Sequence, residues 1–253
     1  MASIIKSELD WPAPSNIHAF VTSRQGGYSI ENFSSLNLAF HVNDKLDLVA
    51  RNRALLQASV SRDLTFQWLS QIHSASVFQV DSSGPDKKGD GLLCKKAGIV
   101  CCILTADCLP VFFTNKQGTE IAIAHVGWRG MSEGIIQNVV NAMESNPREV
   151  ITWLGPAIGP CHFEVGEEVK FIFSQSHWPD MLRHDVQRCF SCASEPKKYF
   201  LDLYQAAKLI LSSMGISEVY GGDECTHCQE EKYFSFRRDG DTGRMVSAIF
   251  IEP

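Results

Sequence analysis

Two side chains that could do chemistry together, a thiol and an imidazole, lie at the open end of one predicted β-hairpin. Its strands are the apolar runs from Leu109 to Phe113 and from Ile121 to Ala124, joined by a polar turn with Asn and Gly, a pattern typical of a hairpin. A turn centred on Asn115 to Gly118 places Cys108 opposite His125. Cβ atoms of cross-strand partners lie roughly 5 Å apart, so this pair could share a metal ion or a proton.

His73 is the third candidate of this kind, because it lies in the turn Gln71–Ser74 between two strand-like segments. Two imidazoles and one thiolate suit Zn²⁺, and three protein ligands leave the fourth tetrahedral position open to water. The same donors resemble a trigonal copper site, and Cys108 with His125 could instead form a metal-free nucleophile pair. A buried, inert Cys beside an unrelated His is the simplest alternative. Residue types alone do not choose among these four.

Anion binding is the second chemistry that the sequence offers. Arg24 lies beside two glycines, Arg129 lies between two glycines, and Arg53 falls on a predicted helix. Arginine binds phosphate and carboxylate in bidentate fashion, and glycine neighbours let an anion approach the backbone. A helix predicted to begin near Ser132 would add unpaired N–H groups. Asp107, next to the thiol, is a candidate proton carrier or a partner that orients a ligand, and it could equally cap a turn.

Two Cys-x-x-Cys motifs, Cys189 to Cys192 and Cys225 to Cys228, are candidates for a structural zinc site. Paired motifs of this kind normally bind zinc. Here 33 positions and the strongest helical pattern of the C-terminal half separate Cys192 from Cys225, a wider gap than zinc ribbons use. We therefore expect unrelated reduced thiols at these positions.

Composition excludes several classes of partner. Of the 253 residues, 44% are hydrophobic and 21% are charged, and the net charge is −6, as in an ordinary globular protein. The lack of a long basic run argues against nucleic acid or an anionic membrane as the partner. No apolar run approaches the roughly 20 residues of a membrane span, and no signal peptide is visible among the first residues. The nine cysteines are an odd number, and with no signal peptide in view we expect reduced thiols and a cytoplasmic location. The composition leaves small-molecule partners open, such as an anion held by a few local arginines.

The elements that must position these side chains follow from periodicity and turn residues. We predict strands at 17–23, 66–69, 77–80, 98–104, 109–113, 121–124, 150–154, 219–220, 233–236 and 246–251, and helices at 47–60, 135–143, 167–173 and 203–214. The stretch 81–91 is predicted to be a surface loop, and 178–196 an irregular, mobile excursion. No repeat, linker or composition shift marks a boundary. The pattern predicts one domain over 1–253, with mixed sheets and helices on the outside.

Ten stretches that together span nearly the whole chain resemble the YfiH family, also described as laccase-domain or polyphenol-oxidase-like proteins. They are TSRQGG at 22–27, SLNLAFHV at 35–42, NR at 52–53, QIHSASV at 71–77, TADCLPV at 105–111, AHVGWRG at 124–130, GPAIGPCHFEVG at 155–166, LDL at 201–203, CT at 225–226 and FSFRRDGDTGR at 234–244. One departure is His162, which stands where many relatives carry a second Cys after Cys161. The Cys189 to Cys192 motif also matches no family stretch.

The resemblance implies an α+β fold with α-β-β-α layers, in which mixed β-sheets lie between helices. It also implies purine nucleoside phosphorylase activity on adenosine, inosine and methylthioadenosine, with adenosine deamination alongside. The residues it assigns to zinc are His73, Cys108 and His125. We expect catalysis from Cys108, His125 and Asp107, and substrate or phosphate contacts from Arg24, Asn37, Arg53 and Arg129.

We therefore expect a zinc-dependent purine nucleoside phosphorylase, and three other functions stay open. A copper-dependent polyphenol oxidase with a multicopper centre would need many imidazoles, whereas the chain has eight His and no His-x-His. A Cys–His hydrolase with Cys108 as nucleophile could edit a peptidoglycan precursor. A non-catalytic protein could hold the zinc for structure alone. The sequence leaves the preferred nucleoside and the oligomeric state undetermined.

Overall fold

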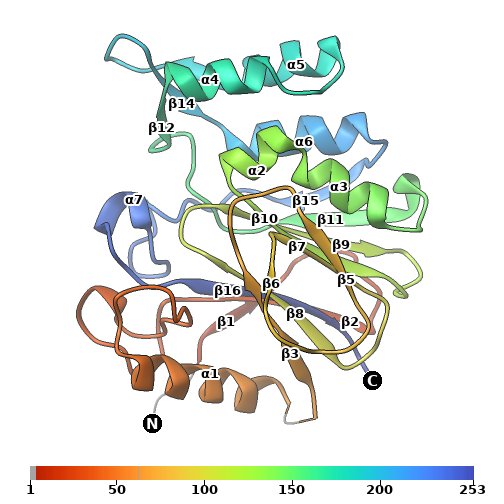
Figure 1. The fold of residues 1–253 in the computed structure, drawn as a ribbon, viewed down its shortest axis with the longest axis vertical. Helices are drawn as coiled ribbons and strands as arrows, with labels where there is room; N and C mark the ends of the chain where they lie inside the picture. The colour runs from red at the N-terminus through yellow and green to blue at the C-terminus, as the bar shows by residue number, and fades with distance from the viewer. Residues whose placement is uncertain (1–3, 62) are drawn as a thin grey trace.

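Two mixed β-sheets stack face to face, and helices cover both outer faces of the stack (Figure 1). The computed structural model describes residues 4–61 and 63–253. In the view of Figure 1, helices α2 (Trp128–Glu133), α3 (Ile135–Ala142) and α6 (Leu203–Ser213) lie above the sheets, and α1 (Leu46–Val60) lies below them. The predicted α+β fold with α-β-β-α layers is confirmed.

The lower sheet has five strands, in the order β1 (Lys6–Glu8), β2 (Ile17–Thr22), β16 (Met245–Ile251), β8 (Ile99–Thr105) and β3 (Thr65–Gln67). Strand β16 pairs antiparallel with both β2 and β8, whereas β3 pairs parallel with β8. The first and last long strands of the chain are therefore neighbours at the centre of this sheet.

The upper sheet has six strands and carries the predicted hairpin. Their order is β15 (Glu218–Gly221), β11 (Val150–Leu154), β9 (Leu109–Asn115), β10 (Ile121–Val126), β7 (Gly91–Cys94) and β5 (Val77–Val80). The two outer pairs are parallel and the inner pairs are antiparallel. Every residue of β8, β9 and β10 is buried, which explains their continuous apolar runs: both faces of these strands are covered.

Three of the apolar clusters of the core match the layers of the stack. Phe112, Ile123 and Ile249 pack between the two sheets. A second cluster fills the space between the upper sheet and its helices, and a third lies between the lower sheet and α1. Helix α6 begins at the predicted cap, where the carboxylate of Asp202 accepts a hydrogen bond from the backbone N–H of Gln205.

The hairpin forms as predicted, but its predicted register is wrong. Strands β9 and β10 pair His125 with Pro110, so Cys108 does not lie directly across from His125. The turn is displaced because Asn115 is the last strand residue rather than part of the turn. Its side-chain oxygen accepts hydrogen bonds from the backbone N–H groups of Thr119 and Glu120, which closes the loop one residue later along the chain.

The helix predicted to begin near Ser132 begins earlier. Gly127 caps α2, so Ser132 lies inside that helix, and its hydroxyl donates to the carbonyl of Arg129. Gly134 adopts a positive φ of 94° between α2 and α3, a conformation that glycine tolerates best. The single predicted helix is therefore two short ones with a break between them.

The predicted strand at 233–236 and the irregular stretch at 178–196 also differ from expectation. Tyr233 and Phe234 are buried, but they lead into helix α7 (Phe236–Asp239), which Ser235 caps. Residues 178–196 contain helix α5 (Asp180–Gln187) and strand β13 (Phe190–Cys192). The helix forms because Leu182 and Val186, one turn apart, are buried in the cluster between the upper sheet and its helices. The polar residues and the exposed Met181 at its other positions hide the period in the sequence.

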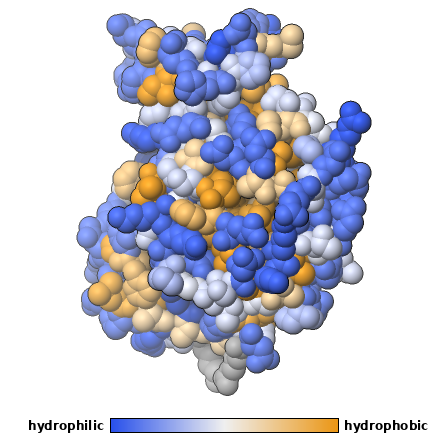
Figure 2. All heavy atoms as spheres, turned by 45° about the vertical axis from the view of Figure 1, so that its right-hand side comes forward, coloured by the Kyte–Doolittle hydropathy of each residue, from blue (hydrophilic) through white to orange (hydrophobic). Residues whose placement is uncertain are grey.

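An outer layer lies beyond α6, at the top of Figure 1. It contains α4 (Glu167–Ser174), α5 and a sheet in the order β12 (Glu164–Gly166), β14 (Lys198–Leu201) and β13. In Figure 2 this layer stands above the body of the molecule, and hydrophobic side chains are visible among mostly hydrophilic neighbours. Among the described residues, no helix is both long and apolar enough to cross a membrane. The remaining short elements are η1 (Glu31–Phe33), η2 (Pro147–Glu149), β4 (Leu69–Ser70) and β6 (Lys87–Lys88).

Candidate functional site

The two imidazoles and the thiol singled out in the sequence meet at one end of the upper sheet. His125 is the penultimate residue of β10, Cys108 lies in the turn between β8 and β9, and His73 lies in the turn before β5. Their ligand atoms all lie within 4.8 Å of one another. The two imidazole rings meet edge to face, with centroids 4.8 Å apart. The loss of the predicted register therefore leaves the predicted cluster intact.

A buried carboxylate, Asp90, organises this cluster. Its oxygens accept hydrogen bonds from the backbone N–H groups of Ile72 (3.3 Å), His73 (3.0 Å) and Ser74 (2.7 Å). They also accept from the Ser74 hydroxyl at 2.9 Å and lie 2.8 Å from Nδ1 of His125. One carboxylate thus fixes the turn that carries one imidazole and orients the other ring. This is the usual arrangement behind a metal-bound histidine, whose second nitrogen is then free for the metal.

The electrostatics of the pair favour a thiolate. Burial alone would raise the pKa of Cys108, but the neighbouring His125 and hydrogen bonds from both imidazoles lower it to about 6. Burial alone would lower the pKa of His125, but Cys108 and Asp90 raise it to about 9. The thiolate is the form of cysteine that binds metals or attacks electrophiles. Metal binding would displace the proton from the imidazole.

Glycine at position 127 leaves room in front of the cluster. A Cβ atom on Gly127 would lie 3.1 Å from Sγ of Cys108 and 3.1 Å from Cδ2 of His73. A Cβ atom on Gly130 would lie 2.8 Å from the backbone oxygen of Ser74. The first turn of α2 can approach the cluster this closely only because both positions lack a side chain.

The donors fit a zinc ion. Two imidazoles and one thiolate on three separate chain segments are a known zinc ligand set, and three protein ligands leave one position for water or substrate. Copper also accepts two imidazoles and a thiolate. Within the part of the chain that the structure describes, no fourth His, Cys, Asp or Glu joins this group.

A cavity of about 440 Å³ opens beside the cluster, within the size range of about 300–1,000 Å³ that small-molecule sites occupy. Its wall combines cationic, polar and aromatic side chains. The lining residues are His41, Gln71, His73, Leu104, Thr105, Ala106, Asp107, Cys108, His125, Gly127, Trp128, Arg129, Ile158, Phe163, Leu203, Phe236, Arg237 and Arg244.

Two further residues singled out in the sequence lie on this wall, Arg129 and Asp107. Arg129 is exposed, and its guanidinium lies 4.2 Å from the centroid of the Trp128 ring. Asp107 is buried with a positive φ of 90°. Its two carboxylate oxygens accept hydrogen bonds from the Thr226 hydroxyl and from the backbone N–H of Arg237, each at 2.7 Å. Both oxygens of Asp107 are thus already engaged by the protein.

Arg24 and Arg53 do not line the cavity. The Nε of Arg24 donates to the backbone oxygen of Ser34 at 3.0 Å. The Nε of Arg53 donates to the backbone oxygen of Leu38 at 2.9 Å, and its guanidinium lies 3.9 Å from the Trp68 ring centroid. Both arginines therefore hold loops of the N-terminal third, and their contact with phosphate stays a prediction.

Asn37 is fully buried and also lies outside the lining. Its amide donates to Asp44 at 2.9 Å, and its side-chain oxygen accepts from the backbone N–H groups of Ala39 (3.0 Å) and Arg244 (3.1 Å). These contacts give Asn37 an indirect link to the cavity, because Arg244 is one of the lining residues.

Sequence reasoning missed several residues of the site, among them Asp90, His41, Gln71 and Arg244. Asp90 fell in the stretch 81–91, whose prediction as a surface loop is wrong at its end, because Asp90 is buried and β7 begins at the next residue. The other three lie in the motifs SLNLAFHV, QIHSASV and FSFRRDGDTGR. Those motifs were the available signal, although they did not show which of their residues face the cavity.

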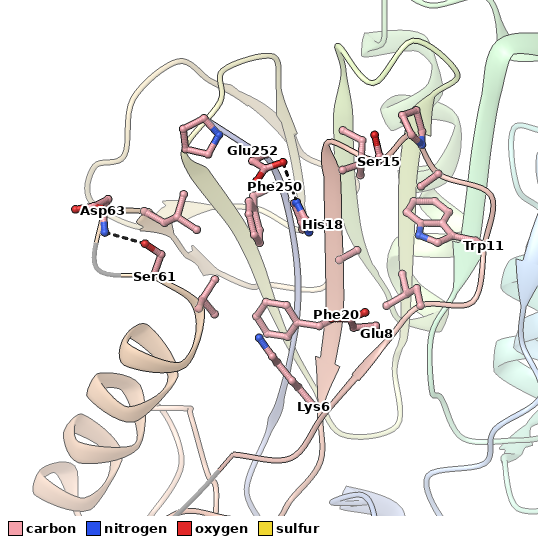
Figure 3. Close-up of a pocket in the computed structure, with 18 residues that line it drawn as sticks. Lys6, Glu8, Trp11, Ser15, His18, Phe20, Ser61, Asp63, Phe250 and Glu252 are labelled. Atoms are coloured by element: carbon pink, nitrogen blue, oxygen red, sulfur yellow. Dashed lines mark hydrogen bonds and ion pairs between the residues drawn. The ribbon is translucent and has the colours of Figure 1, made fainter.

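A second hollow, of about 590 Å³, shares no residue with this cavity. It lies against the outer side of β2 and β16, and Figure 3 shows Lys6, Phe20 and Phe250 on its wall. His18 and Glu252 approach each other to 3.5 Å there. Neither candidate metal group of the described chain borders this hollow, so we place the chemistry at the other cavity.

Known proteins match this chain over a range that includes every residue of the site. The profile of a family described as multi-copper polyphenol oxidoreductase laccase matches residues 18–252. A purine nucleoside phosphorylase from Haemophilus influenzae is 41% identical over 245 residues, covering 96% of this chain and 98% of the relative. The Escherichia coli purine nucleoside phosphorylase YfiH is 39% identical, covering 95% of this chain and 96% of the relative.

Solved structures show the same likeness. The crystal structure of a Neisseria meningitidis protein superposes with a TM-score of 0.91 at 39% identity, covering 98% of this chain and 99% of that one. The crystal structure of YlmD from Geobacillus stearothermophilus gives a TM-score of 0.85 at 30% identity, covering 96% and 94%. The resemblance therefore holds at the level of the complete fold.

Proposed function

Because the chain belongs to the laccase-domain family that contains the YfiH proteins, we propose that it is a zinc-dependent enzyme that splits purine nucleosides with phosphate. Relatives named purine nucleoside phosphorylase, aligned over almost the whole chain, support an enzyme of this kind. The observation that carries the proposal is the joint placement of three metal-type donors and several arginines on the wall of one cavity.

Phosphorolysis makes two demands that this wall can meet. An oxygen of phosphate forms a bond to C1′ of the ribose while the bond from C1′ to the base breaks, and the departing base takes up a proton. The dianionic phosphate needs cationic donors near C1′, since charge-assisted hydrogen bonds are the strong ones. The flat base needs an apolar surface, which Phe163, Phe236 and Trp128 offer.

Arg129 and Arg244 are the proposed phosphate ligands. Arg129 is exposed on the cavity wall beside the cluster, where its guanidinium lies over the Trp128 ring. Arg244 is held in place, because its guanidinium donates to the backbone oxygens of Thr242 (2.6 Å) and Gly243 (3.0 Å). Burial lowers the pKa of Arg244, but an arginine remains charged at neutral pH.

The other residues of the site act by position. We propose that His73, Cys108 and His125 hold the zinc ion, which when bound would polarise a substrate oxygen or lower the pKa of a water. Asp90 orients two of these ligands. Because both oxygens of Asp107 accept protein hydrogen bonds, we assign it a positioning role rather than that of a proton carrier. His41, whose pKa is lowered by burial and then by Arg244 and Arg53, is a neutral hydrogen-bonding group on the wall.

The proposed substrates are adenosine, inosine and methylthioadenosine, and we propose adenosine deamination as a side reaction of the same cavity. Release of the free base should depend on phosphate, which separates phosphorolysis from hydrolysis. Formation of inosine from adenosine should not depend on phosphate. Product analysis with and without phosphate therefore tests each activity separately.

Replacing Arg129 with Gln should raise the apparent KM for phosphate and leave the zinc content unchanged. One lost charge-assisted contact costs roughly 1.5–3 kcal/mol, or about one to two orders of magnitude in kcat/KM for phosphate. Steady-state kinetics at varied phosphate measures this. Arg148→Gln is the matched control, because Arg148 is exposed and lies away from the cavity. An unchanged KM for phosphate in Arg129→Gln would remove this arginine from the phosphate site.

One geometric feature favours a second candidate, a Cys–His hydrolase such as one that edits a peptidoglycan precursor. Asp90, His125 and Cys108 stand in the order of a carboxylate, a base and a nucleophile, and the pKa of the thiol is lowered to about 6. Activity of the metal-free protein distinguishes the two, because a hydrolase would work without metal. Alkylation of the Cys108 thiol should then abolish that activity. A copper polyphenol oxidase, which the family description suggests, would instead consume oxygen with phenols only after copper is added.

A further inference from the structure

A second cluster of sulfur and nitrogen donors lies outside the cavity, where the loop after β11 meets the segment after β15. Cys161 and His162 come from the first segment, and Cys225 and Cys228 come from the second. Their four ligand atoms all lie within 4.8 Å of one another. The proposed phosphorolysis uses none of these side chains.

The separations between the donors are those of metal ligands rather than of a disulfide. Sγ of Cys161 lies 3.7 Å from Sγ of Cys225 and 3.6 Å from Sγ of Cys228. Nδ1 of His162 lies 3.2 Å from Sγ of Cys161 and 3.3 Å from Sγ of Cys228. A disulfide would need a sulfur–sulfur distance of about 2.05 Å. Tetrahedral zinc places sulfur ligands roughly 3.8 Å apart, and sulfur and nitrogen ligands roughly 3.6 Å apart.

Contacts behind the donors are of the kind that supports a metal site. The backbone N–H of Gly159 donates to Sγ of Cys225 at 3.1 Å, a contact that stabilises a thiolate. A Cβ atom on Gly159 would lie 3.3 Å from the sulfurs of both Cys161 and Cys225, so the bare backbone lets the loop curl around them. The ring of His162 stacks on that of His227, with centroids 3.8 Å apart. These contacts fix a sulfur and an imidazole before any ion enters.

The two segments are also held together by the backbone. The N–H of Thr226 donates to the oxygen of Ala157 at 3.0 Å, in an isolated parallel bridge between Ala157 and Cys225. Cys161 and Cys228 are exposed, so an ion has a path from solvent. The donors are thus preorganised on one side and accessible on the other.

We propose that Cys161, His162, Cys225 and Cys228 form a second metal site, which binds zinc with four protein ligands and has a structural role. Four protein ligands close the coordination sphere, as in structural zinc sites, whereas the cavity cluster has three. Three thiolates and one imidazole select a soft or borderline ion and disfavour magnesium or calcium. The Cys225-x-x-Cys228 motif thus pairs with Cys161 and His162 instead of Cys189 and Cys192.

The position of this second site connects it to the wall of the cavity. The backbone N–H of Ile158 donates to the oxygen of Asp107 at 2.9 Å, and the hydroxyl of Thr226 donates to its carboxylate at 2.7 Å. Each of the two segments that the ion would join therefore also holds Asp107, and both Asp107 and Ile158 line the cavity. A bound ion would fasten this part of the cavity wall, so its four ligands are positioning residues.

Zinc content tests the proposal on the full chain. Protein prepared with zinc and reductant, and then dialysed against metal-free buffer, should hold two zinc ions per chain. Cys228→Ser should hold one, Cys108→Ala should hold one, and the double variant should hold none. Cys192→Ser removes an exposed thiol that belongs to neither cluster, and it should retain two. A wild-type protein with one zinc ion, all of it kept in Cys228→Ser, would overturn the proposal.

Cobalt substitution guards against loss of metal through misfolding. In the Cys108→Ala background, cobalt(II) should give a thiolate-to-metal absorption band that His162→Ala or Cys228→Ser weakens while the circular dichroism spectrum stays unchanged. The background variant lacks the thiol of the cavity, so failure of the proposed phosphorolysis does not affect this result. Absence of a thiolate band in that background would contradict the proposal. A disulfide would also contradict it, and titration of the unfolded, metal-free wild-type protein would then find two fewer free thiols than the nine in the sequence.

Discussion

Replacing Cys108 with Ala is expected to remove one bound zinc ion and to abolish most phosphorolysis at the same time. Cys108 supplies the only anionic donor among the three clustered side chains, so the two imidazoles that remain form a weak neutral site. Even loss of a residue that merely supports a metal ligand costs about 10–100-fold in affinity or activity, and loss of the thiolate itself should cost at least about 100-fold. Elemental analysis and the rate of base release measure the two effects on one preparation.

Cys192→Ala is the matched control for this experiment, since its thiol is exposed and lies in neither metal-type cluster. It should keep both the zinc content and the rate. If Cys108→Ala retained all its zinc, the proposed ligand set would be wrong. Full zinc with lost activity would instead support Cys108 as a nucleophile.

Asp90→Asn is expected to give the second large loss, although Asp90 need not touch a metal or a substrate. Its carboxylate accepts hydrogen bonds from three backbone N–H groups and one hydroxyl in the Ile72–Ser74 turn. It also contacts the His125 ring. An amide presents one oxygen and one donor in the same space, so the NH₂ group must face a donor. We expect zinc affinity to fall about 10–100-fold and the free energy of unfolding to fall by about 1.5–3 kcal/mol.

Competition with a chelator measures the affinity, and urea unfolding measures the stability. Asp86→Asn removes a negative charge from the exposed part of the same segment and should change neither quantity. Wild-type zinc affinity in a folded Asp90→Asn protein would show that the carboxylate has no part in positioning the imidazoles.

The buried strands and the approach of His125 to the thiol could be predicted because their signals are local, whereas the α-β-β-α layers and the full zinc ligand set were implied by the resemblance to the YfiH family. The apolar runs of β8, β9 and β10 predict buried strands, and Asp202 indicates the start of α6. The hairpin needed only a turn of approximate length to bring His125 near the thiol. Its register depended on a side-chain contact, the capping of the loop by Asn115, that periodicity does not contain.

The supporting residues could not be predicted because their partners are distant in the sequence. Asp90 follows a polar and charged stretch, as a surface residue would, and only the fold brings it to His125, 35 positions away. Cys161 and Cys228 are 67 positions apart, so spacing within each Cys-x-x-Cys motif gave no indication of their proximity. Among the predicted anion ligands, Arg24 and Arg53 have the right chemistry, but the fold commits the Nε–H of each to a loop carbonyl.

The most direct test of the central claim is a product analysis of adenosine incubated with the zinc-loaded protein. Parallel reactions with and without phosphate are separated by chromatography, and adenine, ribose 1-phosphate, ribose and inosine are quantified. We predict adenine and ribose 1-phosphate in equal amounts, at a rate that rises with phosphate and saturates. Adenine released with ribose at a rate indifferent to phosphate, or inosine as the sole product, would contradict phosphorolysis as the activity of this protein.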